Sequence, residues 1–418
     1  MDFSFIHAAD LHLGSPFLGL ASDDRELAKR VASASREAFE DLVSEAIDRQ
    51  VQFMLIAGDI YDGDWRDTTI GHFFNRQMSR LDRAQIPVFQ VKGNHDAESV
   101  ITSAITLPAS VKTFPAQKAD TFRIPELNVA IHGQSFAERS VSENLVLKYP
   151  KAEPGWFNIG VLHTSCDGRP GHATYAPCEL GQLLQRGYQY WALGHVHNYE
   201  VLNEHPPVIF PGNLQGRHIN ERGPKGAVLV EVSDGEVRTH SRLLLDRIRW
   251  AAIRVDLTGI AKDAEAFVTI RKAIQQEVTD AGSIPIVFRM TLTGSTPLNR
   301  SLRVDRQRIN DEVVAAANHC TELIWLESLK ITTLEPSTQA PQPGSPLANL
   351  DFKVLLDLLA GSAEVDREAR EAMELIKGKF PSMNIPEDLF SEEGIASMVQ
   401  EARETLVASS VGSEVREA

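Results

Sequence analysis

Five apolar runs in this sequence end on side chains that could bind metal ions or transfer protons. Their oxygen and nitrogen donors, without thiolates, suit Mn, Fe or Zn better than Ca or Mg. Seven such side chains, one of them a shared carboxylate, are about what two adjacent metal ions need once water and substrate complete the shells. The five clusters are Asp10-Leu11-His12, Gly58-Asp59, Gly93-Asn94-His95-Asp96, His163 and Gly194-His195-Val196-His197.

Each cluster taken alone has an ordinary structural explanation. An Asp-x-His triplet can shape a loop, a Gly-Asp pair after a strand is commonly a turn, and the chain has 13 histidines. The order and recurrence of all five clusters favour a functional site, because loops at the carboxyl ends of strands in an open α/β sheet meet in one crevice.

The apolar runs that precede the clusters are typical of strands buried on both faces. Between residues 1 and 245 they alternate with helical patterns near 23–49 and 69–84, which predicts a layered α/β domain. The expected strands are 3–10, 51–59, 86–94, 127–133, 157–164, 188–197 and 207–213, followed by a hairpin over 226–245 with an Asp-Gly turn.

The pattern restarts after residue 245. Strand and helix signals over 246–335 predict a small α+β domain, and the Pro-rich segment 336–349 predicts a linker. Amphipathic helices are expected over 350–418. An apolar stripe that includes Leu350, Val354 and Leu358 could lie in the groove of a partner protein or pack back on its own domain.

Charge and composition leave the class of substrate open. The net charge is −15, and residues 351–418, with 7 Lys and Arg against 15 Asp and Glu, supply −8 of it. Neither a signal peptide nor an apolar segment long enough to span a membrane is expected. The three cysteines lack metal-site or redox spacing, which fits free thiols in a reducing cytoplasm.

The five clusters together resemble the signature of calcineurin-like metallophosphoesterases. FIHAADLHLGSPFLGL (5–20) and PGNLQGRHINERGPKG (211–226) are similar to the SbcD-type DNA repair exonuclease branch. The resemblance covers residues 1–245, the next domain looks like the capping domain of that branch, and the last 70 residues match loosely. It implies a β-sandwich flanked by helices and a two-metal DNA exonuclease or endonuclease that acts in double-strand-break repair.

The resemblance also implies roles for individual residues. Asp10, His12 and His197 would bind one metal, Asn94, His163 and His195 the other, and Asp59 would bridge them. His95 would protonate the leaving oxygen, and Asp96 could orient His95. Asp62 resembles a position with a supporting role outside the metal shell. Mn²⁺ is the expected metal, with Fe, Zn or Mg as alternatives.

A basic loop is the candidate for contacts with DNA, and the resemblance implies protein partners. Arg217, His218, Arg222 and Lys225 could contact the phosphates of DNA, or they could form a solvated basic loop. The resemblance implies an SMC-like coiled-coil ATPase partner and a homodimer.

The competing hypotheses for the function are a phosphatase or small-nucleotide phosphodiesterase, and a non-catalytic DNA-binding scaffold. The presence of all seven ligands and His95 argues against the scaffold.

Overall fold

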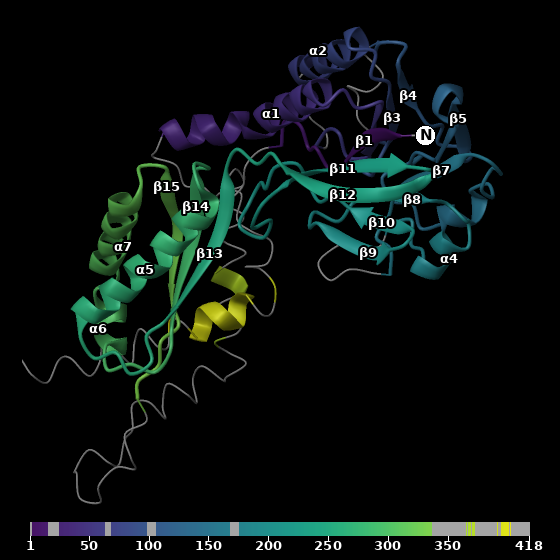
Figure 1. Ribbon diagram of the computed structural model, residues 1–418. Coiled ribbons are helices and arrows are strands. Elements are labelled where there is room, and N and C mark those ends of the chain that lie inside the picture. The colour runs from purple at the N-terminus through teal and green to yellow at the C-terminus, as the bar shows by residue number, and fades with distance from the viewer. Residues whose placement is uncertain are drawn as a thin grey trace, which may run out of the picture. The chain divides into compact units, whose positions relative to one another are not determined.

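The computed structural model describes residues 2–15, 25–62, 68–97, 106–167 and 175–336, together with 394–400 and a few positions between 365 and 402. The chain divides into two compact units, one ending at Arg249 and one beginning at Trp250 (Figure 1). All but the first residue of the expected linker 336–349 and most of the expected helices over 350–418 lie outside the described residues, although 394–400 is helical. The domain boundaries and the tail helices therefore stay predictions.

The first sheet of the first unit positions three of the five clusters. It contains six strands in the order β12 (Glu236–Leu244), β11 (Gly226–Ser233), β1 (Phe3–Ala8), β2 (Phe53–Ala57), β3 (Val88–Val91) and β4 (Val111–Thr113). β1 to β4 are parallel, and β11 pairs antiparallel with β1 and β12. Every residue of β2 and β3 is buried, as the apolar runs predict.

The second sheet of the first unit positions the other two clusters. Its six strands have the order β5 (Asp120–Ile124), β6 (Val129–Gly133), β7 (Phe157–His163), β8 (Tyr190–Gly194), β10 (Pro207–Phe210) and β9 (Glu200–Glu204). The four central strands, β6, β7, β8 and β10, are parallel, and antiparallel strands close both edges. Both sheets thus present several parallel strands whose carboxyl ends can carry a shared site.

Aromatic and branched side chains fill the space between the two sheets. Phe5 of β1 stacks on Phe53 of β2 with ring centroids 4.8 Å apart, and it meets Tyr190 of β8 edge-on at 5.2 Å. All three rings belong to one buried cluster that draws on both sheets. Face-to-face packing of this kind makes the first unit a β-sandwich.

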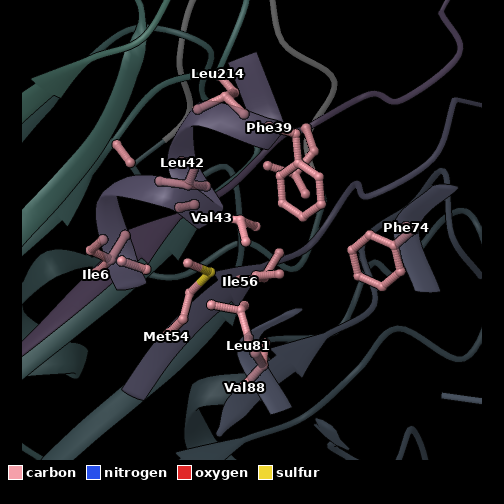
Figure 2. Close-up of a cluster of buried hydrophobic side chains, with 14 of the residues drawn as sticks. Ile6, Phe39, Leu42, Val43, Met54, Ile56, Phe74, Leu81, Val88 and Leu214 are labelled. Atoms are coloured by element: carbon pink, nitrogen blue, oxygen red, sulfur yellow. The ribbon is translucent and has the colours of Figure 1, made fainter. Parts of the chain in front are cut away.

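Helices cover the outer faces of the sandwich. α1 (Arg25–Asp48) and α2 (Thr68–Arg83) lie on the first sheet, where Phe39 and Leu42 of α1 pack against Ile6 and Met54 (Figure 2). On the second sheet lie α4 (Leu180–Leu184) and the 3₁₀ helix η2 (Leu145–Lys148), while η1 (Pro125–Leu127) joins β5 to β6. This architecture confirms the predicted layered α/β class. Within the described ranges, each helix is too short or too polar to cross a membrane.

The second unit is a small α+β arrangement. Three strands, β13 (Arg249–Asp256), β14 (Ile286–Thr293) and β15 (Ile324–Ile331), form a sheet, and β14 and β15 are parallel. Three helices accompany it, α5 (Asp263–Ala281), α6 (Asn299–Val304) and α7 (Arg306–Cys320). Ile270 of α5 and Ile309 of α7 share a buried cluster with Phe288 of β14, so these helices cover one face of the sheet.

The pairing of β14 with β15 should depend on pH through one ion pair. The guanidinium of Arg289 makes two bonds to Glu327, at 2.6 and 2.8 Å. Burial would raise the pKa of Glu327, but the contacts with Arg289 hold it below its usual value. A carboxylate with a depressed folded pKa adds stability that is present above its unfolded pKa and is lost as the pH falls through the folded pKa.

We therefore expect Glu327→Gln to lower the free energy of unfolding of this unit by about 1 kcal/mol at pH 7. The difference from the wild type should shrink as the pH approaches 3. Hydrogen exchange of β14 and β15 amides would measure it, with exposed Glu322→Gln as the control. An equal difference at both pH values would contradict the prediction.

Candidate metal centre

The seven predicted ligands lie at or just beyond the carboxyl ends of five strands. They are Asp10 and His12 after β1, Asp59 after β2, Asn94 after β3, His163 at the end of β7, and His195 and His197 after β8. The first four follow strands of the first sheet and the last three follow strands of the second. The structure brings side chains from both sheets together, as parallel strands ending on one side require.

The backbone at this site is held in an unusual conformation. Asp10, His12, Asp59 and His195 have positive φ angles of 51°, 43°, 52° and 102°. Residues other than glycine seldom adopt this region, and they persist there only when the surroundings enforce it. Two backbone hydrogen bonds of 3.0 Å contribute, from Asp10 N to the Gly58 oxygen and from His12 N to the Asp59 oxygen.

One group of donors consists of Asp10, His12 and His197. One ligand atom from each lies within 4.8 Å of the others. The Nε2 atoms of His12 and His197 face each other at 3.2 Å. These are the three residues that the sequence analysis assigns to the same metal.

A second group consists of Asp10, Asp59 and His163, whose ligand atoms also lie within 4.8 Å. Nδ1 of His163 is 2.9 Å from the carbonyl oxygen of Ala57, which can only accept, so Nδ1 carries the proton. Its Nε2 therefore presents a lone pair, 3.5 Å from Asp59 Oδ2 and 3.0 Å from Asn94 Oδ1. The Nε2 lone pair of His163 and the Asn94 Oδ1 atom are both acceptors, and a cation between them would satisfy both.

His195 places its ring beside the second group and supports the first group by its backbone. Its imidazole lies edge-on to His163, with centroids 5.2 Å apart. Its backbone N–H donates to both carboxylate oxygens of Asp10, at 3.0 and 3.1 Å. The residue thus ties the loop after β8 to the loop after β1.

The electrostatics of the donor set fit divalent cations. Burial, followed by the neighbouring Asp59 carboxylate, raises the pKa of Asp10 well above its usual value. Burial also raises the pKa of Asp59 and lowers that of His163 to about 3. Carboxylates packed together out of water with neutral imidazoles are stabilised in their ligating forms by nearby cationic charge. The clustered residues therefore suit a binuclear site for divalent metal ions.

His95 stands beside these groups and is more accessible. Its side chain is 24% exposed, whereas that of His163 is fully buried. Its backbone N–H donates to Asp59 Oδ1 at 3.0 Å, and its Nδ1 lies 3.0 Å from Asp62 Oδ1. Burial lowers the pKa of His95, but the Asp62 and Asp59 carboxylates outweigh this effect and raise it. A protonated imidazole in this position could serve as a general acid.

The expectation that Asp96 orients His95 needs correction, because Asp62 is the carboxylate placed against the His95 ring. The buried carboxylate of Asp96 accepts hydrogen bonds from three backbone N–H groups. The donors are Ile60, Tyr61 and Gly93, at 2.9, 3.0 and 3.1 Å. These bonds join the loop after β2 to the loop after β3, so Asp96 shapes the loops that carry Asp59 and His95.

Glu221 is a site residue that the sequence analysis did not identify. Its Oε1 lies 2.8 Å from Nδ1 of His197, and its Oε2 accepts from Asn213 Nδ2 at 2.8 Å. A carboxylate behind a ligating histidine fixes its tautomer and raises its basicity. The available signal was its position, because Glu221 is the one acidic residue among the basic side chains of the loop after β10.

The four basic residues expected to contact substrate lie in different environments. Arg222 is exposed and His218 is partly exposed. Lys225 is a correction, because it is only 3% exposed and its Nζ donates to the His197 carbonyl oxygen at 2.6 Å. Burial lowers its pKa to about 8. Arg217 lies against two carboxylates of the site.

The close approach of the two sheets at the site should make Gly194 irreplaceable. A Cβ on Gly194 would lie 1.9 Å from the backbone oxygen of Ala57, which cannot move without disturbing β2. We expect Gly194→Ala to lower the free energy of unfolding by about 3 kcal/mol or more. Gly181→Ala in α4 is the control, because nothing lies within 4 Å of its Cβ. Urea unfolding measures both variants, and equal stability would contradict the prediction.

The comparisons with known proteins agree with this geometry. The calcineurin-like phosphoesterase family matches residues 3–199, and the middle domain of the metallophosphoesterase YhaO matches 250–334. The chain belongs to the calcineurin-like metallophosphoesterase family, which confirms the resemblance at the level of the superfamily. A phosphoester hydrolase activity follows from that membership.

The chain is similar in sequence to a YhaO protein and to Mre11 proteins. The YhaO protein of Bacillus subtilis, called an uncharacterized metallophosphoesterase, is 34% identical over 300 residues, which are 71% of this chain and 73% of that protein. A DNA double-strand break repair protein Mre11 from Thermoplasma acidophilum is 25% identical over 63% of this chain and 69% of its own. The protein of the same name from Sulfurisphaera tokodaii is 23% identical over 73% of this chain and 77% of its own.

Proposed function

We propose that this protein is a Mn²⁺-dependent DNA exonuclease, with endonuclease activity on single strands, that acts in double-strand-break repair. The observation that carries the proposal is the gathering of the seven predicted ligands and His95, with the His195 ring beside that of His163. The names of the Mre11 relatives support DNA as the substrate.

In this proposal Asp10, His12 and His197 hold one cation, Asn94, His163 and His195 hold the other, and Asp59 serves both. When bound, two divalent cations neutralise phosphate charge and supply a nucleophile from water at neutral pH. The carbonyl oxygen of Ala57 and the carboxylate of Glu221 orient His163 and His197 with their Nε2 lone pairs toward the site. Mixed carboxylate, amide and imidazole donors favour Mn²⁺ over Mg²⁺.

His95 supplies the acid in this proposal. Asp62 lies against its Nδ1, which leaves the other ring nitrogen to donate a proton to the departing 3′ or 5′ oxygen of DNA. Asp59 holds the His95 backbone in register with the ligand groups. Protonation of the leaving oxygen matters for DNA, because an alkoxide is a poor leaving group.

Arg222 and His218 are the side chains that we propose for contacts with DNA phosphates, since both retain exposed surface. An SMC-like ATPase that binds the C-terminal helices and a homodimer remain parts of the proposal. A cytoplasmic location is proposed from the cysteine content.

The test is incubation of the purified chain with an end-labelled linear duplex, with Mn²⁺ and with a chelator. We expect progressive loss of nucleotides with Mn²⁺ only. Asp10→Asn is the control for a contaminating nuclease, because it removes a carboxylate common to both donor groups. Equal cleavage by this variant would place the activity elsewhere.

Other outcomes point to the competing functions. Intact DNA together with hydrolysis of small phosphodiesters, unchanged when the ATPase partner is added, would favour a small-nucleotide phosphodiesterase. Binding of DNA without any hydrolysis would favour a scaffold.

A further inference from the structure

We propose that Arg217 is a positioning residue that holds two carboxylates in place, one behind a metal-ligating histidine and one behind the leaving-group acid. The inference rests on the proposed phosphodiester hydrolysis and deepens it, because it replaces the expected contact between Arg217 and a DNA phosphate with a role inside the protein. The two carboxylates are Glu221 and Asp62.

Glu221 stands behind His197. Its side chain is 5% exposed, and Oε1 lies 2.8 Å from His197 Nδ1. Oε2 accepts from Asn213 Nδ2 at 2.8 Å and from the backbone N–H of Arg217 at 2.7 Å. An ionised carboxylate can only accept, so the His197 proton sits on Nδ1. Nε2 then presents its lone pair toward His12, in the first donor group.

Asp62 stands behind His95. Its Oδ1 lies 3.0 Å from His95 Nδ1 and 3.8 Å from His12 Nδ1. The side chain is 18% exposed, so it is largely shielded from water. A carboxylate in ion-pair contact with Nδ1 leaves Nε2 available for proton transfer.

The guanidinium of Arg217 spans the two carboxylates. Nη2 and Nε donate to Glu221 at 2.6 and 3.2 Å, and Nη1 lies 3.5 Å from Asp62 Oδ2. Nη2 is also 3.3 Å from His197 Nδ1, but the proton on that nitrogen is directed to the nearer Glu221 oxygen. With its side chain 13% exposed, Arg217 has little surface left for DNA. Its planar fork can serve two carboxylates, unlike the point charge of a lysine.

The test separates positioning from substrate binding by measuring metal affinity as well as turnover. Metal-free full-length wild type and Arg217→Gln are titrated with Mn²⁺ by calorimetry. Both are then assayed at saturating Mn²⁺ on the end-labelled DNA duplex, whose alkoxide leaving group needs a proton. We expect Arg217→Gln to bind Mn²⁺ about tenfold or more weakly and to lose kcat about tenfold, with KM changed less than about threefold.

Two further variants separate the effect of the Arg217–Glu221 contact from that of the Arg217–Asp62 contact. Glu221→Gln should reproduce mainly the loss of Mn²⁺ affinity, and Asp62→Asn mainly the loss of kcat. Arg238→Gln on β12 is the matched control, because it removes an exposed arginine away from the site. If circular dichroism shows that Arg217→Gln does not fold, Arg217→Lys carries the test. This variant keeps one positive charge but should not restore both the Mn²⁺ affinity and the kcat of the wild type.

The proposal would be overturned by a rise in KM with kcat and Mn²⁺ affinity preserved, which would make Arg217 a phosphate ligand. Full recovery of both properties in Arg217→Lys would also overturn it, because charge alone would then suffice. The calorimetry does not depend on catalysis, so a wild type that cleaves neither DNA nor the small diester refutes the proposed function while the Mn²⁺ titrations still decide the role of Arg217.

Discussion

Asp59→Asn should lower the rate of DNA hydrolysis by about 10³-fold or more, which corresponds to about 4 kcal/mol of lost transition-state stabilisation. The carboxylate belongs to one donor group and borders the other, with Oδ2 at 3.5 Å from His163 Nε2 and 3.9 Å from His12 Nε2. Its Oδ1 also accepts the backbone N–H of His95. An amide of the same shape has one accepting oxygen and no charge, so it cannot serve both sides.

The measurement pairs the nuclease rate with the number of Mn²⁺ ions bound per chain by calorimetry. Asp234→Asn in the turn between β11 and β12 is a demanding control, because Asp234 has nearly the same positive φ, 55° against 52°, but is exposed and outside the site. If both variants lose activity to the same extent, the effect of Asp59→Asn comes from the backbone conformation and not from metal ligation.

His95→Asn should separate proton transfer from metal binding. We expect kcat on DNA to fall by about 10²- to 10⁴-fold, the usual contribution of a general acid, with Mn²⁺ affinity unchanged. The His95 side chain contacts Asp62 beside the donor groups, and its partial exposure suits contact with a substrate. The loss should depend on the leaving group, because p-nitrophenolate departs without a proton whereas a DNA alkoxide does not.

The diagnostic quantity is therefore the ratio of the two losses. Wild type and His95→Asn are compared on the labelled duplex and on bis(p-nitrophenyl) phosphate at saturating Mn²⁺. A much smaller loss on the p-nitrophenyl ester supports the acid role. Equal losses on both substrates, or weaker Mn²⁺ binding, would instead make His95 a ligand or a purely structural residue.

Much of the first unit was predictable from short-range patterns. A buried parallel strand needs a nearly continuous apolar run, so β1, β2, β3, β7, β8 and β10 follow directly from the sequence. The short strands β4, β5 and β9 were missed, because edge strands are partly exposed and carry mixed residues such as Val-Lys-Thr. α6 was missed as well, since its six residues complete fewer than two turns.

The site was predictable in its donors but not in its supporting contacts. Metal-type donors after successive strands can be read from the chain, because topology alone brings those strand ends together. Which carboxylate supports which histidine depends on loops that return from far away, such as the 24 residues of separation between His197 and Glu221. The sequence of a basic loop also does not indicate which side chains are buried, and here Lys225 is buried whereas Arg222 is exposed.

The division of the donors between two sheets has a thermodynamic consequence. Cations bound by Asp10 of the first sheet and His197 of the second would cross-link the halves of the sandwich, and the unfolded chain could not reproduce that site. By mass action, free Mn²⁺ at one hundred times its dissociation constant would add about 2.7 kcal/mol per site to the free energy of unfolding. Metal starvation would then shorten the lifetime of the folded protein against proteases, in addition to stopping its chemistry.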